Sequence, residues 1–144
     1  MSIIRTDDQA DAQQILKLII ETADFYRAMG ALLTEENVEH QLFEVAEERE
    51  AYTEPFQEVL KELDELPMAP DPEKELVEEL YGKVTQLFSA DLKGAILDKC
   101  LNKDELLAAL ISNTALGAHS AEAKKALDAL HDHLAHTKNR LLNN

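Results

Sequence analysis

The chain has 144 residues, which suits one compact domain, and 45% of them are hydrophobic, enough to bury a core at this size. Gly and Pro number four each and Trp is absent, while Ala, Leu, Glu and Lys are abundant, which is typical of a helical bundle. The formal charge of −15 would repel a nucleic-acid backbone, so we expect no nucleic-acid partner.

The single cysteine, Cys100, excludes an internal disulfide, and its place on an apolar stripe indicates a packed side chain rather than a nucleophile. The first residues carry no signal-peptide pattern. No stretch reaches the roughly 18 consecutive apolar residues of a membrane span. We therefore expect a cytoplasmic protein without a membrane partner.

Two long helices are predicted in the first half of the chain, over residues 8–33 and 36–66. Apolar residues recur every three or four positions in both, and Glu21 borders the stripe of the first. A short turn near residues 34–37 makes the second helix antiparallel to the first. Pro55 removes a backbone N–H inside the second, so we expect a kink there or a break into two segments.

Arg49 and Tyr52 occupy positions on the apolar stripe of residues 36–66 where Leu or Ile would be expected. A charge buried without a partner is very unfavourable. Arg49 must therefore be paired with an acidic or hydrogen-bonding group from another helix.

The second half of the chain begins with the strongest break, PMAPDP at residues 67–72. Helices are predicted over residues 73–88, 91–114 and 121–142. Asp104 places a charge on the apolar stripe of 91–114. Residues 116–120 indicate a turn, with Gly117 ending one helix and Ser120 capping the next. The order is that of an all-α, up-down four-helix bundle, a single domain over residues 1–144 with a short helix in its long crossover, the ferritin-like arrangement.

Three phrases of the sequence resemble the ferritin-like superfamily: FEVAEERE at residues 43–50, ILDKCLNKDELLAAL at 96–110 and LHDHLAHTKNRLL at 130–142. The similarity extends over roughly residues 15–142. It is greatest to small, rubrerythrin-related bacterial domains of unknown function. The resemblance implies the bundle topology and, in metal-binding members, a di-iron or di-manganese centre.

Di-iron members place one Glu on each of two helices and a Glu-x-x-His pair on each of the other two. By this resemblance Glu21 matches the lone Glu of the first helix, and Asp104, beside Glu105, lies near that of the third. The pair on the second helix falls at Arg49 and Tyr52, neither of which is the family's ligand. On the last helix the candidates are Asp128-x-x-His131 and His133-x-x-His136.

Two interpretations of these positions remain. In the first, Arg49 replaces the metals and forms a buried polar layer with Glu21, Tyr52 and Asp104. In the second, a shifted or single-metal site holds iron or manganese, because carboxylates and imidazoles are suitable ligands. Its candidate ligands are Glu21, Glu48, Asp104, His133 and His136.

We expect the first interpretation, which implies a non-enzymatic bundle acting by assembly or protein interaction, with a role in stress by family analogy alone. No hydrolase triad, P-loop or dinucleotide-binding pattern marks an enzyme. The alternatives are a metal-binding redox or iron-handling protein of rubrerythrin type, and a bundle that binds a small ligand inside. A homodimer is expected from the family.

Overall fold

The computed structural model describes residues 7–32, 39–64 and 92–143, and every regular element within them is an α-helix. This confirms the predicted all-α class. None of the described helices is both long and apolar enough to cross a membrane. The helices are α1 (Asp7–Leu32), α2 (Glu39–Glu50), α3 (Thr53–Glu62), α5 (Leu92–Asn113), α6 (Leu116–His119) and α7 (Ala121–Leu142).

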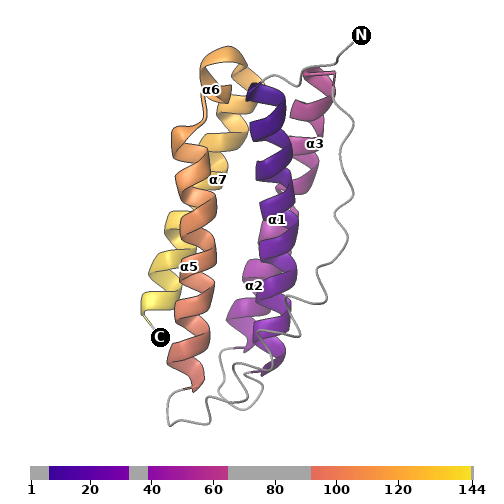
Figure 1. Ribbon diagram of the computed structural model, residues 1–144. Helices are drawn as coiled ribbons and strands as arrows, with labels where there is room; N and C mark the ends of the chain where they lie inside the picture. Colours follow the sequence, from indigo (N-terminus) through magenta and orange to yellow (C-terminus); the bar gives the residue numbers. More distant parts are fainter. Residues whose placement is uncertain (1–6, 33–38, 65–91, 144) are drawn as a thin grey trace.

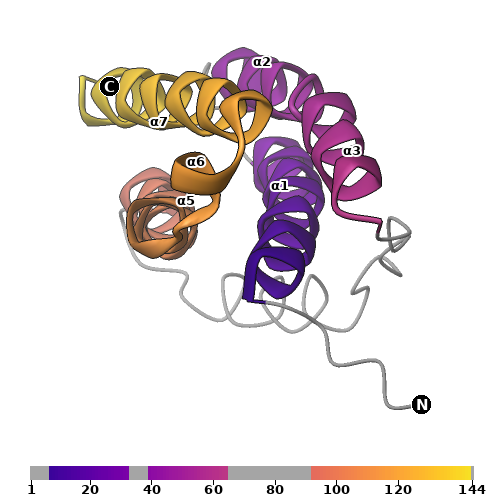
Figure 2. The same cartoon turned by 90° about the horizontal axis from the view of Figure 1, so that it is seen from above.

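The described helices form a bundle in which α1 runs antiparallel to α2 and α3, and α5 runs antiparallel to α7 (Figure 1). Seen from above, the two pairs lie side by side and enclose a common interior (Figure 2). The end of α3 and the start of α5 lie at opposite ends of the bundle (Figure 1). Residues 65–91 join them, and the helix predicted at 73–88 therefore falls outside the described residues.

The long helix predicted over residues 36–66 is divided into α2 and α3, which meet at Ala51 and Tyr52. Pro55 is the physical cause, because its ring would clash with the carbonyl of Ala51 and it has no N–H to donate there. The chain tightens at this point: the Tyr52 N–H donates to the Arg49 carbonyl at 3.0 Å, three residues back. The break therefore begins at Ala51, two residues after Arg49.

The turn predicted at residues 116–120 contains a short helix instead, which corrects the expectation that Gly117 ends a helix. The buried Leu116 anchors α6 against the bundle, and the Ser120 N–H donates to its carbonyl at 3.1 Å. No described glycine has positive φ, so Gly117 is not a left-handed stop. Ser120 does cap α7, since its Oγ accepts the Ala123 N–H at 3.1 Å.

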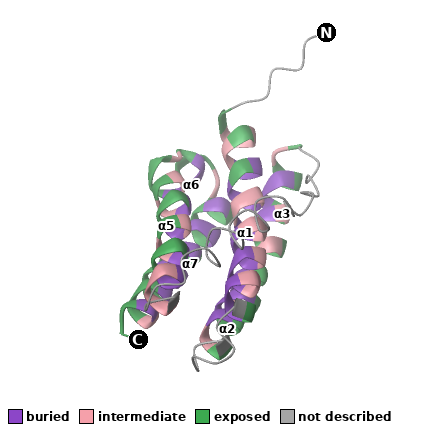
Figure 3. Cartoon of the chain, turned by 60° about the horizontal axis from the view of Figure 1, so that its bottom comes forward, coloured by how far each residue is buried: buried purple, intermediate pink, exposed green. Residues whose placement is uncertain are grey.

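The buried residues face the interior of the bundle, and exposed residues cover its outside (Figure 3). They form two hydrophobic clusters, one toward each end. On α1 the first ends at Ile19 and the second begins at Phe25; on α5 they are separated between Leu107 and Cys100. The buried polar residues Thr22 and Asp104 lie in these gaps. A polar layer thus separates the two apolar halves of the core.

Candidate functional site

The centre of the polar layer is Arg49, which has no exposed surface and is the largest fully buried side chain described. It lies at the end of α2, where the helical period directs it into the bundle. Its guanidinium donates two parallel hydrogen bonds to Asp104 on α5, from Nη1 to Oδ1 at 2.9 Å and from Nη2 to Oδ2 at 3.0 Å. This bidentate geometry is the strongest pairing that Arg and a carboxylate can form.

Two further hydrogen bonds complete the surroundings of the guanidinium. Nη1 also donates to Thr22 Oγ1 on α1 at 2.8 Å, and Nε donates to His133 Nε2 on α7 at 2.9 Å. The Thr22 hydroxyl in turn donates to the Ile19 carbonyl at 3.2 Å. One side chain therefore connects α1, α2, α5 and α7.

His133 must be neutral at Nε2, because arginine can only donate and this nitrogen accepts. The environment favours that state: burial, followed by the positive charge of Arg49, lowers the pKa of His133 from 6.5 to about 4. The imidazole thus serves as an acceptor for a buried cation rather than as a second cation.

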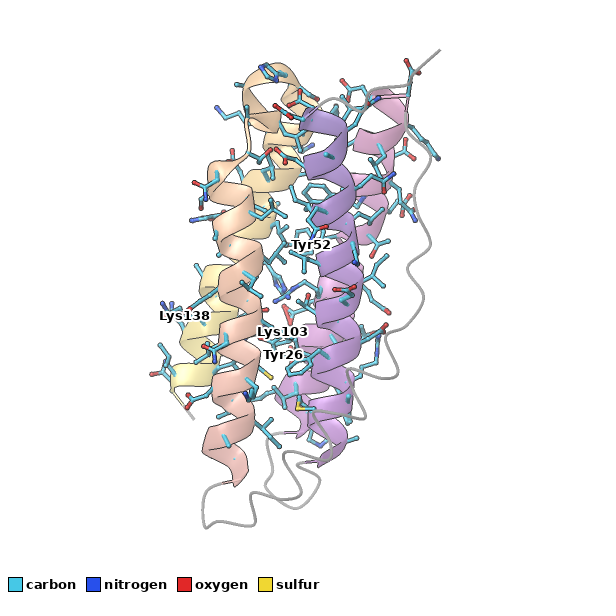
Figure 4. All side chains as sticks on the ribbon, viewed as in Figure 1. Tyr26, Tyr52, Lys103 and Lys138 are labelled. Atoms are coloured by element: carbon cyan, nitrogen blue, oxygen red, sulfur yellow. The ribbon has the colours of Figure 1, made fainter. Side chains whose placement is uncertain are left out.

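Two tyrosines extend the network in opposite directions (Figure 4). The Tyr26 hydroxyl donates to Asp104 Oδ2 at 2.7 Å, and its ring centroid lies 5.3 Å from Arg49 Cζ. Burial and the Asp104 carboxylate raise the pKa of Tyr26. Tyr52, at the α2–α3 break, lies with its ring centroid 5.1 Å from that of His133 and covers the imidazole. We call Thr22, Tyr26, Arg49, Asp104 and His133 the Arg49 cluster.

The structure brings together only part of the predicted layer of Glu21, Arg49, Tyr52 and Asp104. Arg49 and Asp104 are paired, and Tyr52 lies at the edge against His133. Glu21 lies beside Thr22 in the sequence, and its Oε1 lies 3.7 Å from Lys17 Nζ, one turn earlier on α1. Thr22, the next residue, is the one on α1 whose hydroxyl accepts a hydrogen bond from Arg49, and the place of Glu21 in the layer stays a prediction.

Sequence reasoning did not predict three members of the cluster as partners of Arg49: Thr22 and Tyr26, which were not candidate site residues, and His133, which was a candidate metal ligand only. The first two were on the expected apolar stripe of α1, so their burial was foreseeable but their hydrogen bonding was not. His133 follows Leu130 by three residues and precedes Thr137 by four, both fully buried. That spacing could have placed it on the inner face of α7.

The five candidate metal ligands do not gather in one place. Glu48 pairs with Arg140, whose Nη1 lies 2.9 Å from Glu48 Oε2, and His136 is exposed. Asp104 and His133 both direct their polar atoms at Arg49. Across residues 7–32, 39–64 and 92–143, no three His, Cys, Asp or Glu side chains are arranged to hold a metal ion.

The alternative pair Asp128-x-x-His131 lies outside the interior, since both residues are exposed. Cys100 packs in the apolar cluster near Tyr26, and burial raises the pKa of its thiol, which disfavours the nucleophilic thiolate. The described interior therefore presents a hydrogen-bonded cation–anion pair instead of a reactive group.

Comparisons with known proteins identify no relative. The chain matches no protein-family model, no curated protein and no solved structure.

Proposed function

We propose that this chain is a ferritin-like helical bundle in which the Arg49 cluster takes the place of a di-metal centre, and that it acts by assembly or protein interaction. The observation that carries the proposal is the bidentate Arg49–Asp104 pair in the middle of the bundle. A guanidinium held there occupies the space and supplies the charge that bound cations would otherwise supply to the carboxylate.

The ferritin-like topology is supported by two features of the described helices. The antiparallel pair α1 and α2–α3 is followed by the antiparallel pair α5 and α7, and α3 ends at the opposite end of the bundle from the start of α5 (Figure 1). A long crossover between the pairs is the connection that distinguishes ferritin-like bundles from those with short loops only.

The direct test is elemental analysis of untagged protein purified from cells supplied with iron and manganese. We expect far less than one metal per chain, because Arg49 repels cations from the position between Asp104 and His133. About two irons or manganeses per chain, the stoichiometry of a di-metal centre, would refute the proposal.

A variant makes the same test independent of purification history. Arg49→Glu removes the guanidinium and adds a carboxylate beside Asp104, which should lower stability by like-charge repulsion. A cation that binds the folded state raises its melting temperature. We expect Mn²⁺ to raise the melting temperature of Arg49→Glu and to leave the melting temperature of wild type unchanged. The matched control is Arg27→Glu, which makes the same change at an exposed ion pair.

A further inference from the structure

A groove of about 150 Å³ lies between α5 and α7. Each helix lines it with one stripe of residues, spaced so that they share a face of the helix over two turns. A cavity of about this volume with apolar walls holds one group of the size of benzene. The groove therefore suits a single small apolar group. Its lining residues are Leu101, Asp104, Glu105 and Ala108 of α5, and His131, Leu134, Ala135 and Lys138 of α7.

The two walls of the groove carry opposite charges. Glu105 is on the α5 wall and Lys138 is on the α7 wall, and both are exposed. Figure 4 shows Lys138 on the side of α7 away from α1. Neither side chain forms an ion pair with another residue of the described part of the chain. His131 Nδ1 already lies 3.8 Å from Asp132 Oδ1, so Lys138 is the cation that remains available to an anionic group.

The groove reaches the Arg49 cluster at Asp104, which is only 7% exposed and lines the groove. Oδ2 of Asp104 accepts hydrogen bonds from Arg49 and Tyr26, whereas Oδ1 accepts one, from Arg49. Because a carboxylate oxygen has two lone pairs, Oδ1 can accept a further hydrogen bond. A donor group in the groove therefore has two adjacent carboxylates on the α5 wall, those of Asp104 and Glu105.

The separation of the charges fits a ligand that carries both signs. Asp104 and His133 are at the same level of the bundle, because both bind the Arg49 guanidinium. Since α5 and α7 are antiparallel, Glu105 and Lys138 lie on opposite sides of that level, about 9 Å apart along the axis at a rise of about 1.5 Å per residue. The ammonium and carboxylate of one α-amino acid, with a hydrogen bond of about 2.8 Å at each end, extend over a similar length.

We propose that the α5–α7 groove binds a small apolar α-amino acid in its zwitterionic form. The ammonium donates to Asp104 and Glu105, and the carboxylate pairs with Lys138. The apolar side chain packs against Leu101 and Leu134. An amine or a carboxylate alone would use only one of the two charged walls. This site goes beyond the proposed assembly function, which requires no ligand.

The test is a titration of wild type with L-leucine, followed by NMR of the backbone amides. We expect saturable shifts for residues 101–108 and 131–138, with a dissociation constant on the order of 1 mM, ordinary for so small a ligand. L-leucinamide lacks the carboxylate and N-acetyl-L-leucine lacks the ammonium, so each should bind about tenfold more weakly or less. If these shifts do not appear at about 20 mM L-leucine, where a site of this affinity is nearly full, the proposal is wrong.

Two variants assign the charged walls. Lys138→Gln should weaken L-leucine binding about tenfold and leave the affinity for L-leucinamide, which has no carboxylate, within about twofold. Glu105→Gln should weaken the binding of both ligands, because both keep the ammonium. An unchanged affinity for L-leucine in either variant would overturn the proposal, as would equal losses for the two ligands in Lys138→Gln.

Further variants test the place of binding. Ala108→Leu puts a larger side chain into the groove and should abolish the shifts; binding as tight as in wild type would mean that the ligand lies elsewhere. Glu47→Gln on α2 and Lys125→Gln on α7 are matched controls, exposed and outside the groove lining, and should keep the affinity within about twofold. Circular dichroism verifies that each variant is folded. None of these results bears on metal content, which elemental analysis decides separately.

Discussion

Arg49 is a cation without exposed surface, so its effect on stability depends on whether its partners remain. Four hydrogen bonds hold it, two of them to one carboxylate. Removing one member of such a pair leaves the other charge buried without a partner, and this lowers the stability of the fold more than removing both members does.

Arg49→Met should therefore lower the free energy of unfolding by about 3–5 kcal/mol, because Asp104 loses its counter-charge. The loss for Arg49→Met with Asp104→Leu should be smaller than the sum of the single losses, by about 2 kcal/mol. Urea unfolding of the four proteins in this cycle measures the difference. Arg27→Met is the control: its ion pairs are exposed, so its loss should stay below about 1 kcal/mol. Additive losses would mean that the pair is not coupled.

His133 gives stability a pH dependence with a definite sign. Its pKa is about 4 in the folded chain and 6.5 ordinarily, so between these values the unfolded chain binds more protons. Stability therefore decreases as pH falls from 6.5 to 4, by up to about 3 kcal/mol.

His133→Gln should remove the part of the pH dependence of stability that comes from His133, measured by urea unfolding at pH 7 and 4.5. His136→Gln, at an exposed site, should keep the wild-type slope; a common slope for wild type and His133→Gln would contradict the assignment.

Sequence periodicity predicted Arg49 and Asp104 as interior charges because each interrupts an apolar stripe. It placed Thr22 on the apolar stripe of the first helix and Glu21 at its border, but the period of a helix does not say which polar side chain forms a hydrogen bond with a buried charge. His133 was equally ambiguous, because histidine is found both buried and exposed. These choices depend on the partner helices, which no local pattern contains.

At the scale of elements, local signals were sufficient where a cap or a proline acts on its own helix. Ser120 begins α7 through a hydrogen bond to Ala123, and Pro55 divides α2 from α3. The turn at residues 116–120 was misjudged because the burial of Leu116, a tertiary contact, stabilises a helical turn there. Where packing decides the conformation, the glycine signal alone was misleading.

A prediction at this scale concerns Gly30 on α1, where a Cβ atom would come closer to neighbouring side chains than at Gly117. A Cβ at Gly30 would be 2.8 Å from Phe43 Cε1 and 3.3 Å from Leu42 Cβ, whereas at Gly117 the nearest atom is 3.5 Å away. Ala is favoured over Gly within a helix by about 1 kcal/mol. We expect Gly30→Ala to lose about 1 kcal/mol despite this gain and Gly117→Ala to lose nothing. Thermal unfolding compares them, and equal stability would rule out close packing at Gly30.

At the scale of the whole molecule, the all-α class followed from composition and periodicity, but the ferritin-like topology remains a prediction. Helix directions can be inferred from short turns, as for α1 and α2. The direction of the second helix pair relative to the first depends on how residues 65–91 connect them. The proline and acidic residues of this segment do not indicate which end of the bundle it leads to. The resemblance in three phrases adds a hypothesis about this connection.

The formal charge of −15 also acts on the whole molecule, since folding brings like charges closer together. Salt shortens the Debye length from about 30 Å at 0.01 M to about 3 Å at 1 M, which should relieve this repulsion. Salt also weakens exposed ion pairs such as Arg27–Glu50, but each contributes less than about 1 kcal/mol.

At pH 7 we expect 0.5 M NaCl to raise the melting temperature by about 3 °C, which corresponds to roughly 1 kcal/mol in the free energy of unfolding. Near pH 4.6, the isoelectric point, the increase should vanish. Calorimetry in low and high salt at both pH values measures this, and an increase that persists at pH 4.6 would mean that net charge is not the cause.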